Sequence, residues 1–149
     1  MDLRSASAAP KASDAEVTPR ERSFEMRYRA PDGTQHVGRL TSRVLTAQQR
    51  REAGRIAALQ AGAPWEQLPA ATREEIFATN IVARQLLEPR PTWFDSWAAE
   101  DVDLLFAAYA VCVEHTQAFF RGYPGQGGSD EGEARVAVVA LDADGKPLR

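Results

Sequence analysis

Cysteine and histidine are scarce in this chain, and their scarcity limits the metal sites and disulfides that it can form. Among 149 residues, Cys112 is the only cysteine, and His36 and His115 are the only histidines. One cysteine permits no intramolecular disulfide, which suits a reducing cytoplasm. Cys112 and His115 stand three positions apart on a predicted helix, but a zinc site needs about four ligands and no second pair exists. We therefore predict no metal and no cofactor, with Cys112 as a packed thiol and His115 on the helix surface.

Patterns typical of catalysis are also missing. The chain has neither a phosphate-binding glycine loop nor a dinucleotide-binding fingerprint. Cys112 and His115 lie in mid-helix, without an evident orienting group or oxyanion donors, so cysteine-histidine catalysis is not predicted. Asp142-Ala143-Asp144-Gly145 resembles part of a calcium loop, but it lacks the third acidic ligand and the distal glutamate. We interpret that segment as a turn and predict that the protein is not an enzyme.

Long apolar runs are absent as well. The longest uninterrupted run is Leu104 to Val113, whereas a membrane-spanning helix needs about 20 apolar residues. The N-terminal residues contain no run long enough for a secretory signal. The net charge of −3 implies no general affinity for nucleic acid. We expect a cytoplasmic protein that binds neither membranes nor nucleic acids.

Charges of the two signs are unevenly distributed along the chain. No lysine or arginine occurs between Thr92 and Phe120, where five acidic residues lie. Five arginines lie between residues 39 and 55, and only Glu52 opposes them there. Two interpretations follow: the basic helix pairs with the acidic one inside the molecule, or the charges steer a partner.

The centre of the sequence predicts two apolar helices joined by a link that carries two prolines and two tryptophans, residues 88–97. The first helix is expected over Arg73–Leu87, with Thr72 as N-cap and Glu75 completing a capping box. The second is expected over Asp101–Arg121. Because the first helix is apolar nearly all round, it should be buried on several sides or lie at an interface.

The N-terminal half predicts a β-hairpin over Ser23–Thr41, since apolar and polar residues alternate before a Pro31-Asp32-Gly33 turn. Strict alternation places Val37 and Leu40 on opposite faces, so we expect a bulge at Gly38 that returns both to one face.

A third helix is predicted to follow the hairpin. Thr46 should cap it, with Gln49 completing a capping box, and it should run to about Ala61, where Gly62 ends it.

These elements give an α+β fold that is mainly α, with an N-terminal β-hairpin followed by three helices in one domain, residues 23–123. Residues 1–22 are predicted to be a disordered arm and residues 124–149 a flexible tail. Within the tail, residues 136–141 form a short strand-like run, which is either frayed or adhesive because a strand needs an edge to pair with. A domain of this size buries a small core, which favours an oligomer or a partner.

Three tryptophans, Trp65, Trp93 and Trp97, lie in loops near the ends of predicted helices. They are either plugs of a small core or anchors for a partner, since tryptophan is enriched at binding hot spots. The residues predicted to bind a partner are Trp93, Phe94, Trp97, Tyr109 and Phe120.

Several segments, taken in order, resemble one family. They are Phe24–Tyr28, Pro31-Asp32-Gly33, Gly38, Ala57–Gly62, Leu68-Pro69, Arg90-Pro91-Thr92-Trp93, Leu104-Leu105 with Ala108-Tyr109, and Glu114–Phe119 with Gly122. In this order they resemble the small tail-assembly chaperones encoded in the structural gene clusters of tailed phages and prophages. The resemblance covers residues 24–122, and both ends of the chain fall outside it.

This resemblance implies a non-enzymatic phage tail assembly chaperone in the cytoplasm of an infected or lysogenic bacterial host. Such a protein would bind the tape-measure protein, the tail tube protein or both, assist tail tube assembly, and form a homo-oligomer if its own core is too small. The alternative is a structural tail or neck subunit of the particle, in which the hairpin and the terminal run extend a neighbour's sheet.

Overall fold

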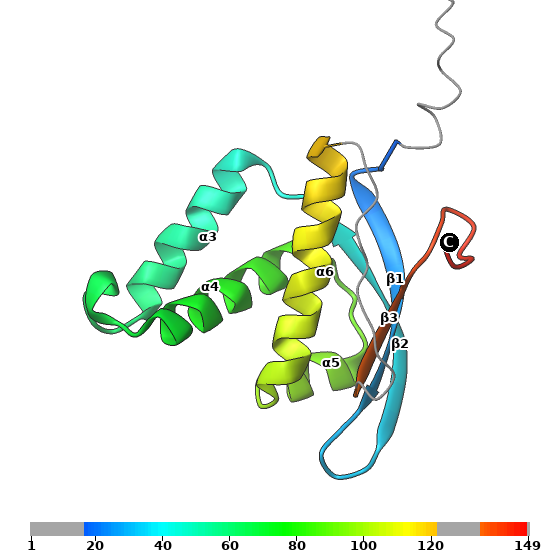
Figure 1. The fold of residues 1–149 in the computed structure, drawn as a ribbon, viewed down its shortest axis with the longest axis horizontal. Coiled ribbons are helices and arrows are strands. Elements are labelled where there is room, and N and C mark those ends of the chain that lie inside the picture. The colour runs from blue at the N-terminus through cyan, green and yellow to red at the C-terminus, as the bar shows by residue number, and fades with distance from the viewer. Residues whose placement is uncertain (1–16, 122–134, 149) are drawn as a thin grey trace, which may run out of the picture.

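A computed structural model of the chain describes residues 17–121 and 135–148. Its elements are β1 (Glu21–Arg29), β2 (Gln35–Arg43), α3 (Ala47–Gln60), a short 3₁₀ helix (Trp65–Gln67), α4 (Ala70–Gln85), α5 (Thr92–Ala98), α6 (Val102–Arg121) and β3 (Val136–Ala140). The three strands form a sheet on one side of the molecule, and the helices all lie on the other side (Figure 1). The predicted fold class, α+β and mainly α with an N-terminal hairpin, is confirmed. None of the helices in these ranges is long and apolar enough to cross a bilayer.

The sheet has the order β2-β1-β3, and both strand pairs are antiparallel. Phe24, Met26 and Tyr28 alternate along β1 and are almost fully buried against the helices, as the apolar period predicts. The hairpin turn is the expected one, with Gly33 at a φ of 91°. Glycine adopts this left-handed conformation without steric cost.

The predicted bulge at Gly38 is wrong. The register of the hairpin is continuous, with Gly38 opposite Met26, so Val37 and Leu40 do lie on opposite faces. Val37 is 57% exposed and Leu40 only 1%. Glycine is required here for a different reason, because a Cβ atom at this position would lie 2.5 Å from Cγ of Pro91 and 3.3 Å from the Trp93 ring.

The strand-like run near the C-terminus forms β3, which pairs with β1 inside its own chain. It is therefore neither frayed nor adhesive, because the free edge that it needs is the edge of β1 that β2 leaves open. The chain before β1 also contacts the body. The Arg20 guanidinium donates to the Val44 carbonyl at 2.7 Å, and β1 begins at Glu21, inside the arm predicted for residues 1–22. Residues 1–16 and 122–134 lie outside the described residues, so their predicted disorder stays a prediction.

The N-cap of α3 is confirmed and that of α4 is corrected. Thr46 and Gln49 form the predicted capping box, with both hydrogen bonds present. By contrast, α4 begins at Ala70 after Pro69 and has no side-chain cap. The Arg73 amide already donates to the Pro69 carbonyl at 3.1 Å, so Thr72 lies within the first turn and cannot cap it.

The end of α4 and the link that follows it both differ from the prediction. α4 ends at Gln85 rather than Leu87 because Leu86 bridges to Ser42 and the Leu87 amide donates to the Thr41 carbonyl at 2.9 Å. The link itself forms α5, a fourth α-helix that the prediction of three helices missed. Pro91 directly precedes its first turn, where a fixed φ is compatible with helix initiation.

Candidate partner-binding groove

The main candidate for a functional site is a groove lined by residues of three helices. α4 packs against both α3 and α6, and these two helices diverge on either side of it (Figure 1). A pocket of about 340 Å³ lies between them. It is lined by eleven described residues, Arg50, Phe77, Ile81, Gln85, Tyr109, Cys112, Val113, Thr116, Gln117, Phe120 and Arg121. We call this pocket the α4 groove, since α4 forms its floor.

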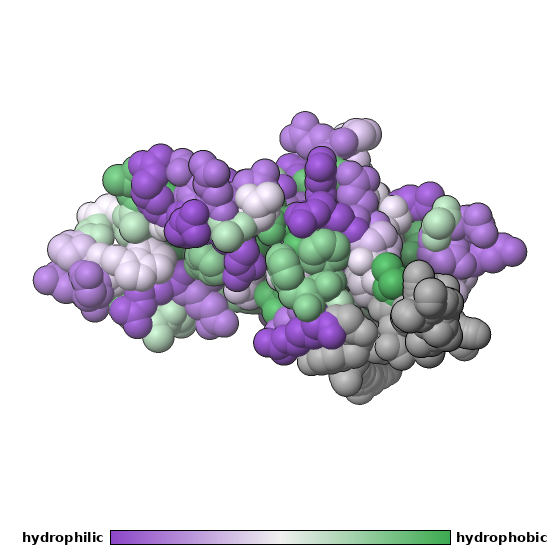
Figure 2. Space-filling model, turned by 90° about the horizontal axis from the view of Figure 1, so that it is seen from above, coloured by the Kyte–Doolittle hydropathy of each residue, from purple (hydrophilic) through white to green (hydrophobic). Residues whose placement is uncertain are grey.

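Five of the eleven residues that line the groove are aromatic or aliphatic, namely Phe77, Ile81, Tyr109, Val113 and Phe120. The rings of Phe77 and Tyr109 meet edge to face, with centroids 6.4 Å apart. Phe120, on the last turn of α6, is 62% exposed, which is unusual for so large an apolar side chain. Viewed from above, apolar surface lies over the middle of the molecule between hydrophilic surfaces (Figure 2).

Three polar groups of the groove, Cys112, Tyr109 and Gln85, are uncharged at physiological pH. Burial raises the pKa of the Cys112 thiol to about 12, so it is neutral and a poor nucleophile at physiological pH. Burial also raises the pKa of Tyr109. Gln85 is fully buried, and its amide nitrogen lies 3.0 Å from Ser42 Oγ and 3.1 Å from the Cys112 carbonyl oxygen. Its side-chain oxygen has no hydrogen-bond partner among the described residues.

The structure divides the five residues predicted to bind a partner. Trp93 and Trp97 lie against the Tyr28 ring and Phe94 belongs to the same hydrophobic core, while Tyr109 and Phe120 line the α4 groove. The Trp93 ring stacks on the Tyr28 ring at 5.9 Å and on the His36 ring at 5.2 Å. Phe94 is 1% exposed.

Two of the three tryptophans therefore pack against the core, as the first of the two interpretations predicts. Trp93 and Trp97 are half-buried against the hydrophobic core. Trp65 is also half-buried, in the 3₁₀ helix between α3 and α4.

His115 is buried, which corrects its predicted position on the helix surface. It is 2% exposed because the face of α6 that carries it packs inward. Its Nδ1 lies 2.7 Å from Ser42 Oγ and its Nε2 lies 2.9 Å from the Pro19 carbonyl oxygen. A carbonyl can only accept, so Nε2 carries the proton and Nδ1 accepts from the serine hydroxyl. Burial lowers the pKa of His115, which favours this neutral form.

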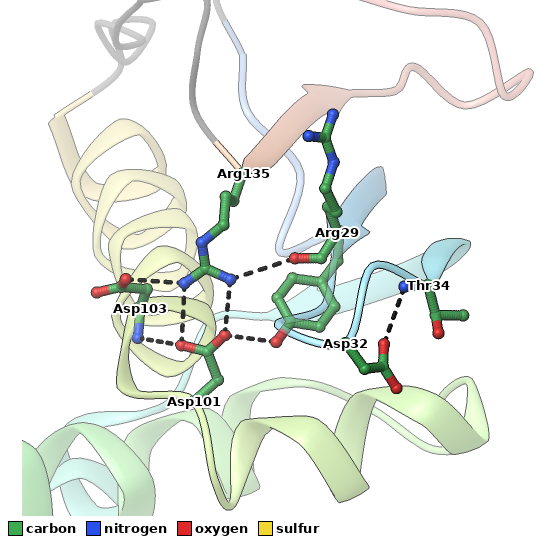
Figure 3. A network of polar contacts seen from close by, with 7 residues as sticks. Arg29, Asp32, Thr34, Asp101, Asp103 and Arg135 are labelled. Carbon is green, nitrogen blue, oxygen red and sulfur yellow. Dashed lines mark hydrogen bonds and ion pairs between the residues drawn. The ribbon is translucent and has the colours of Figure 1, made fainter.

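The acidic start of α6 pairs with the C-terminal segment and not with the basic helix α3. The Arg135 guanidinium binds Asp101 at 3.0 Å and Asp103 at 2.9 Å, and the Tyr28 hydroxyl donates to Asp101 (Figure 3). The hydrogen bond from Arg135 lowers the pKa of Asp101 to about 2. The α3 residue Arg55 instead pairs with Glu52 of the same helix at 2.7 Å. The predicted pairing of the basic and acidic helices is therefore wrong.

The segment that resembles a calcium loop forms a turn, as predicted. The Asp142 carboxylate accepts from the backbone amides of Asp144 and Lys146 at 2.8 and 2.9 Å. These bonds use the carboxylate to stabilise the turn. Within residues 17–121 and 135–148, no group of three histidine, cysteine or acidic side chains is placed to hold a metal ion.

Sequence reasoning missed most of the groove, including Phe77, Ile81 and Arg50. The first two stand four positions apart on α4, and that spacing was visible as one face of an apolar helix. Nothing in the sequence indicates that Arg50 of α3 faces them, because this depends on the angle at which α3 crosses α4.

Comparison of the chain with protein-family models, with curated proteins and with solved structures gave no match. The resemblance to tail-assembly chaperones therefore stays a prediction.

Proposed function

We propose that this protein is a phage tail assembly chaperone, which binds an amphipathic helix of the tape-measure protein in the α4 groove and assists tail tube assembly. The family resemblance supplies the identity of the partner. The observation that carries the proposal is the groove lined by α3, α4 and α6, where five apolar side chains meet and Phe120 is exposed.

The shape of the groove suits a helix. A helix with its side chains is about 10–12 Å across, so it would lie along the opening and insert side chains into the 340 Å³ pocket. Helix-in-groove recognition works in this way, with apolar anchors at positions i, i+3, i+4 and i+7. A bound helix would cover Phe120 and complete the packing of α3, α4 and α6 around one apolar centre.

A chaperone role gives the exposed apolar surface a purpose. Long helical proteins that present apolar stripes before assembly are prone to associate with one another, and covering a stripe prevents this. The groove offers such cover without a reactive group, since its thiol is neutral and buried.

The alternative, a structural tail or neck subunit, has less support. It invoked the terminal strand as an extension of a neighbour's sheet, and β3 already pairs with β1 of its own chain over five residue pairs. That strand would have to leave its own sheet before it could join another.

The proposal is tested by co-expression with the longest coiled-coil protein of the gene neighbourhood, followed by light scattering of the purified material. We expect a soluble complex with that protein, and a monomer or small oligomer when the chain is expressed alone. Phe120→Asp should abolish the complex, since it places a charge at the rim of the groove. If the chain forms the same closed rings with and without the coiled-coil protein, the result would contradict the proposal and favour the structural subunit.

Leu59→Asp is the matched control for Phe120→Asp. Leu59 is 68% exposed, stands one position before the end of α3 as Phe120 does in α6, and does not line the groove. Both variants remove an exposed apolar side chain and add one negative charge. A complex that survives Leu59→Asp but not Phe120→Asp locates the binding in the groove, whereas equal losses would assign the effect to charge or stability.

A further inference from the structure

The charge of the α4 groove differs from that of the molecule as a whole. The chain has a net charge of −3, yet the charged residues among the eleven that line the groove are Arg50 and Arg121, both positive. Arg50 belongs to the α3 wall and Arg121 to the end of the α6 wall. The charged residues that line the groove are thus basic, although the protein as a whole is acidic.

The charge of Arg50 is directed at the groove and is not neutralised by the described part of the chain. Within that part, its guanidinium forms no ion pair, whereas the nearby Arg55 is paired with Glu52. Burial raises the pKa of Tyr109, and the charge of Arg50 opposes this rise. The acidic residue that also acts on Tyr109 is Glu74 of α4, which does not line the groove.

We infer that the helix bound in the groove carries aspartate or glutamate beside its apolar stripe, on the side that faces Arg50. This inference rests on the proposed function and specifies the chemistry of its partner. The apolar stripe would supply most of the affinity. The flanking carboxylates would select the correct stripe and fix its orientation, as complementary charge does at other interfaces.

Two synthetic helical peptides test this inference. Both carry the same leucine stripe at positions i, i+3, i+4 and i+7, flanked by glutamate in one and by lysine in the other. A third peptide has the glutamate composition with a scrambled order. Binding of each to the whole chain is measured by fluorescence anisotropy at low and at high salt.

We expect the glutamate peptide to bind the wild-type protein about threefold to tenfold more tightly than the lysine peptide, since the exposed charge pair with Arg50 changes from attraction to repulsion. High salt should reduce the difference. Arg50→Glu should reduce or reverse the preference, and it should fold normally because acidic residues are favoured in the first turns of a helix. Arg51→Glu is the control, since it makes the same charge change at the next position, outside the groove.

The other possible results of these binding measurements contradict different parts of the proposal. Equal binding of the glutamate and lysine peptides overturns the acidic flank and leaves helix binding intact. Equal effects of Arg50→Glu and Arg51→Glu overturn the role of Arg50. If neither stripe binds better than the scrambled peptide, helix binding in the groove is itself overturned. If dodecanoate displaces the dye-labelled glutamate peptide but the unlabelled peptide does not, the groove is a site for anionic amphiphiles instead of helices.

Discussion

Gly38 is the residue on which the close contact between β2 and the start of α5 depends. A Cβ atom there would lie 2.5 Å from the ring of Pro91 and 3.3 Å from Trp93, so neither neighbour can stay where it is. The aromatic stack of Trp93 with Tyr28 and His36 begins at this contact. A glycine in a strand indicates either a bulge or a close approach of another segment, and the sequence alone does not distinguish the two.

Gly38→Ala should therefore lower the free energy of unfolding by about 1–3 kcal/mol, the usual cost of overpacking. Gly54→Ala is its control. A Cβ atom at Gly54 would meet the Phe77 ring at an ordinary 3.9 Å, and alanine in mid-helix should stabilise by about 0.5–1 kcal/mol. Urea unfolding measures both changes. Similar effects of the two substitutions would show that the contact with Pro91 is not tight.

His115 makes stability depend on pH. Its pKa in the folded protein is lowered from the ordinary 6.5, chiefly by burial, with a further lowering by Arg22 that the Pro19 carbonyl opposes. Below pH 6.5 the unfolded chain takes up a proton that the folded chain does not, so protonation favours unfolding. The stability conferred by the neutral ring is complete above pH 6.5 and declines as the pH falls below it.

We expect the free energy of unfolding to decrease between about pH 7 and pH 5, a range above the ordinary pKa of carboxylates. The variant His115→Gln should be less stable throughout but lack this slope. Denaturant unfolding at a series of pH values measures both. A slope that is the same in wild type and variant would assign it to other groups.

At the scale of elements, local chemistry predicted some boundaries and not others. The cap of α3 was readable because Thr46 and Gln49 satisfy each other's backbone amides without help from the rest of the fold. The same pattern at Thr72 gave a wrong N-cap, because α4 begins at Ala70, directly after Pro69. Because residues 88–97 contain two prolines, the sequence predicted a link there and not the helix α5. The strand β3 could not be predicted as paired, because the sequence does not show which edge of β1 is open.

Paired substitutions separate the true cap from the false one. Thr46→Ala should cost about 1 kcal/mol of stability, the typical loss of a threonine N-cap. Thr72→Ala should change stability by less than about 0.5 kcal/mol, as expected for a site without such a role. Thermal or urea unfolding of the two variants is the measurement. A larger loss at Thr72 than at Thr46 would contradict the helix start that the structure gives.

At the scale of the whole molecule, the arrangement of α3, α4 and α6 creates the candidate site. Apolar periodicity gave the faces of α4 and α6, and it marked Tyr109 and Phe120. It could not give the divergence of α3 from α6, because crossing angles are set by packing between residues far apart in the sequence. The sequence left open whether the tryptophans are core plugs or partner anchors, and Trp93 and Trp97 pack against the hydrophobic core.

If a partner helix occupies the α4 groove, hydroxyl-radical footprinting of aromatic side chains should detect it there. The protein is labelled alone and in complex with the co-expressed coiled-coil protein, and mass spectrometry quantifies the labelling of each residue. We expect Phe120 and Tyr109 to lose labelling in the complex and Trp93 and Trp97 to keep theirs. Loss at Trp93 and Trp97 with no change at Phe120 would contradict this expectation and place the partner at α5.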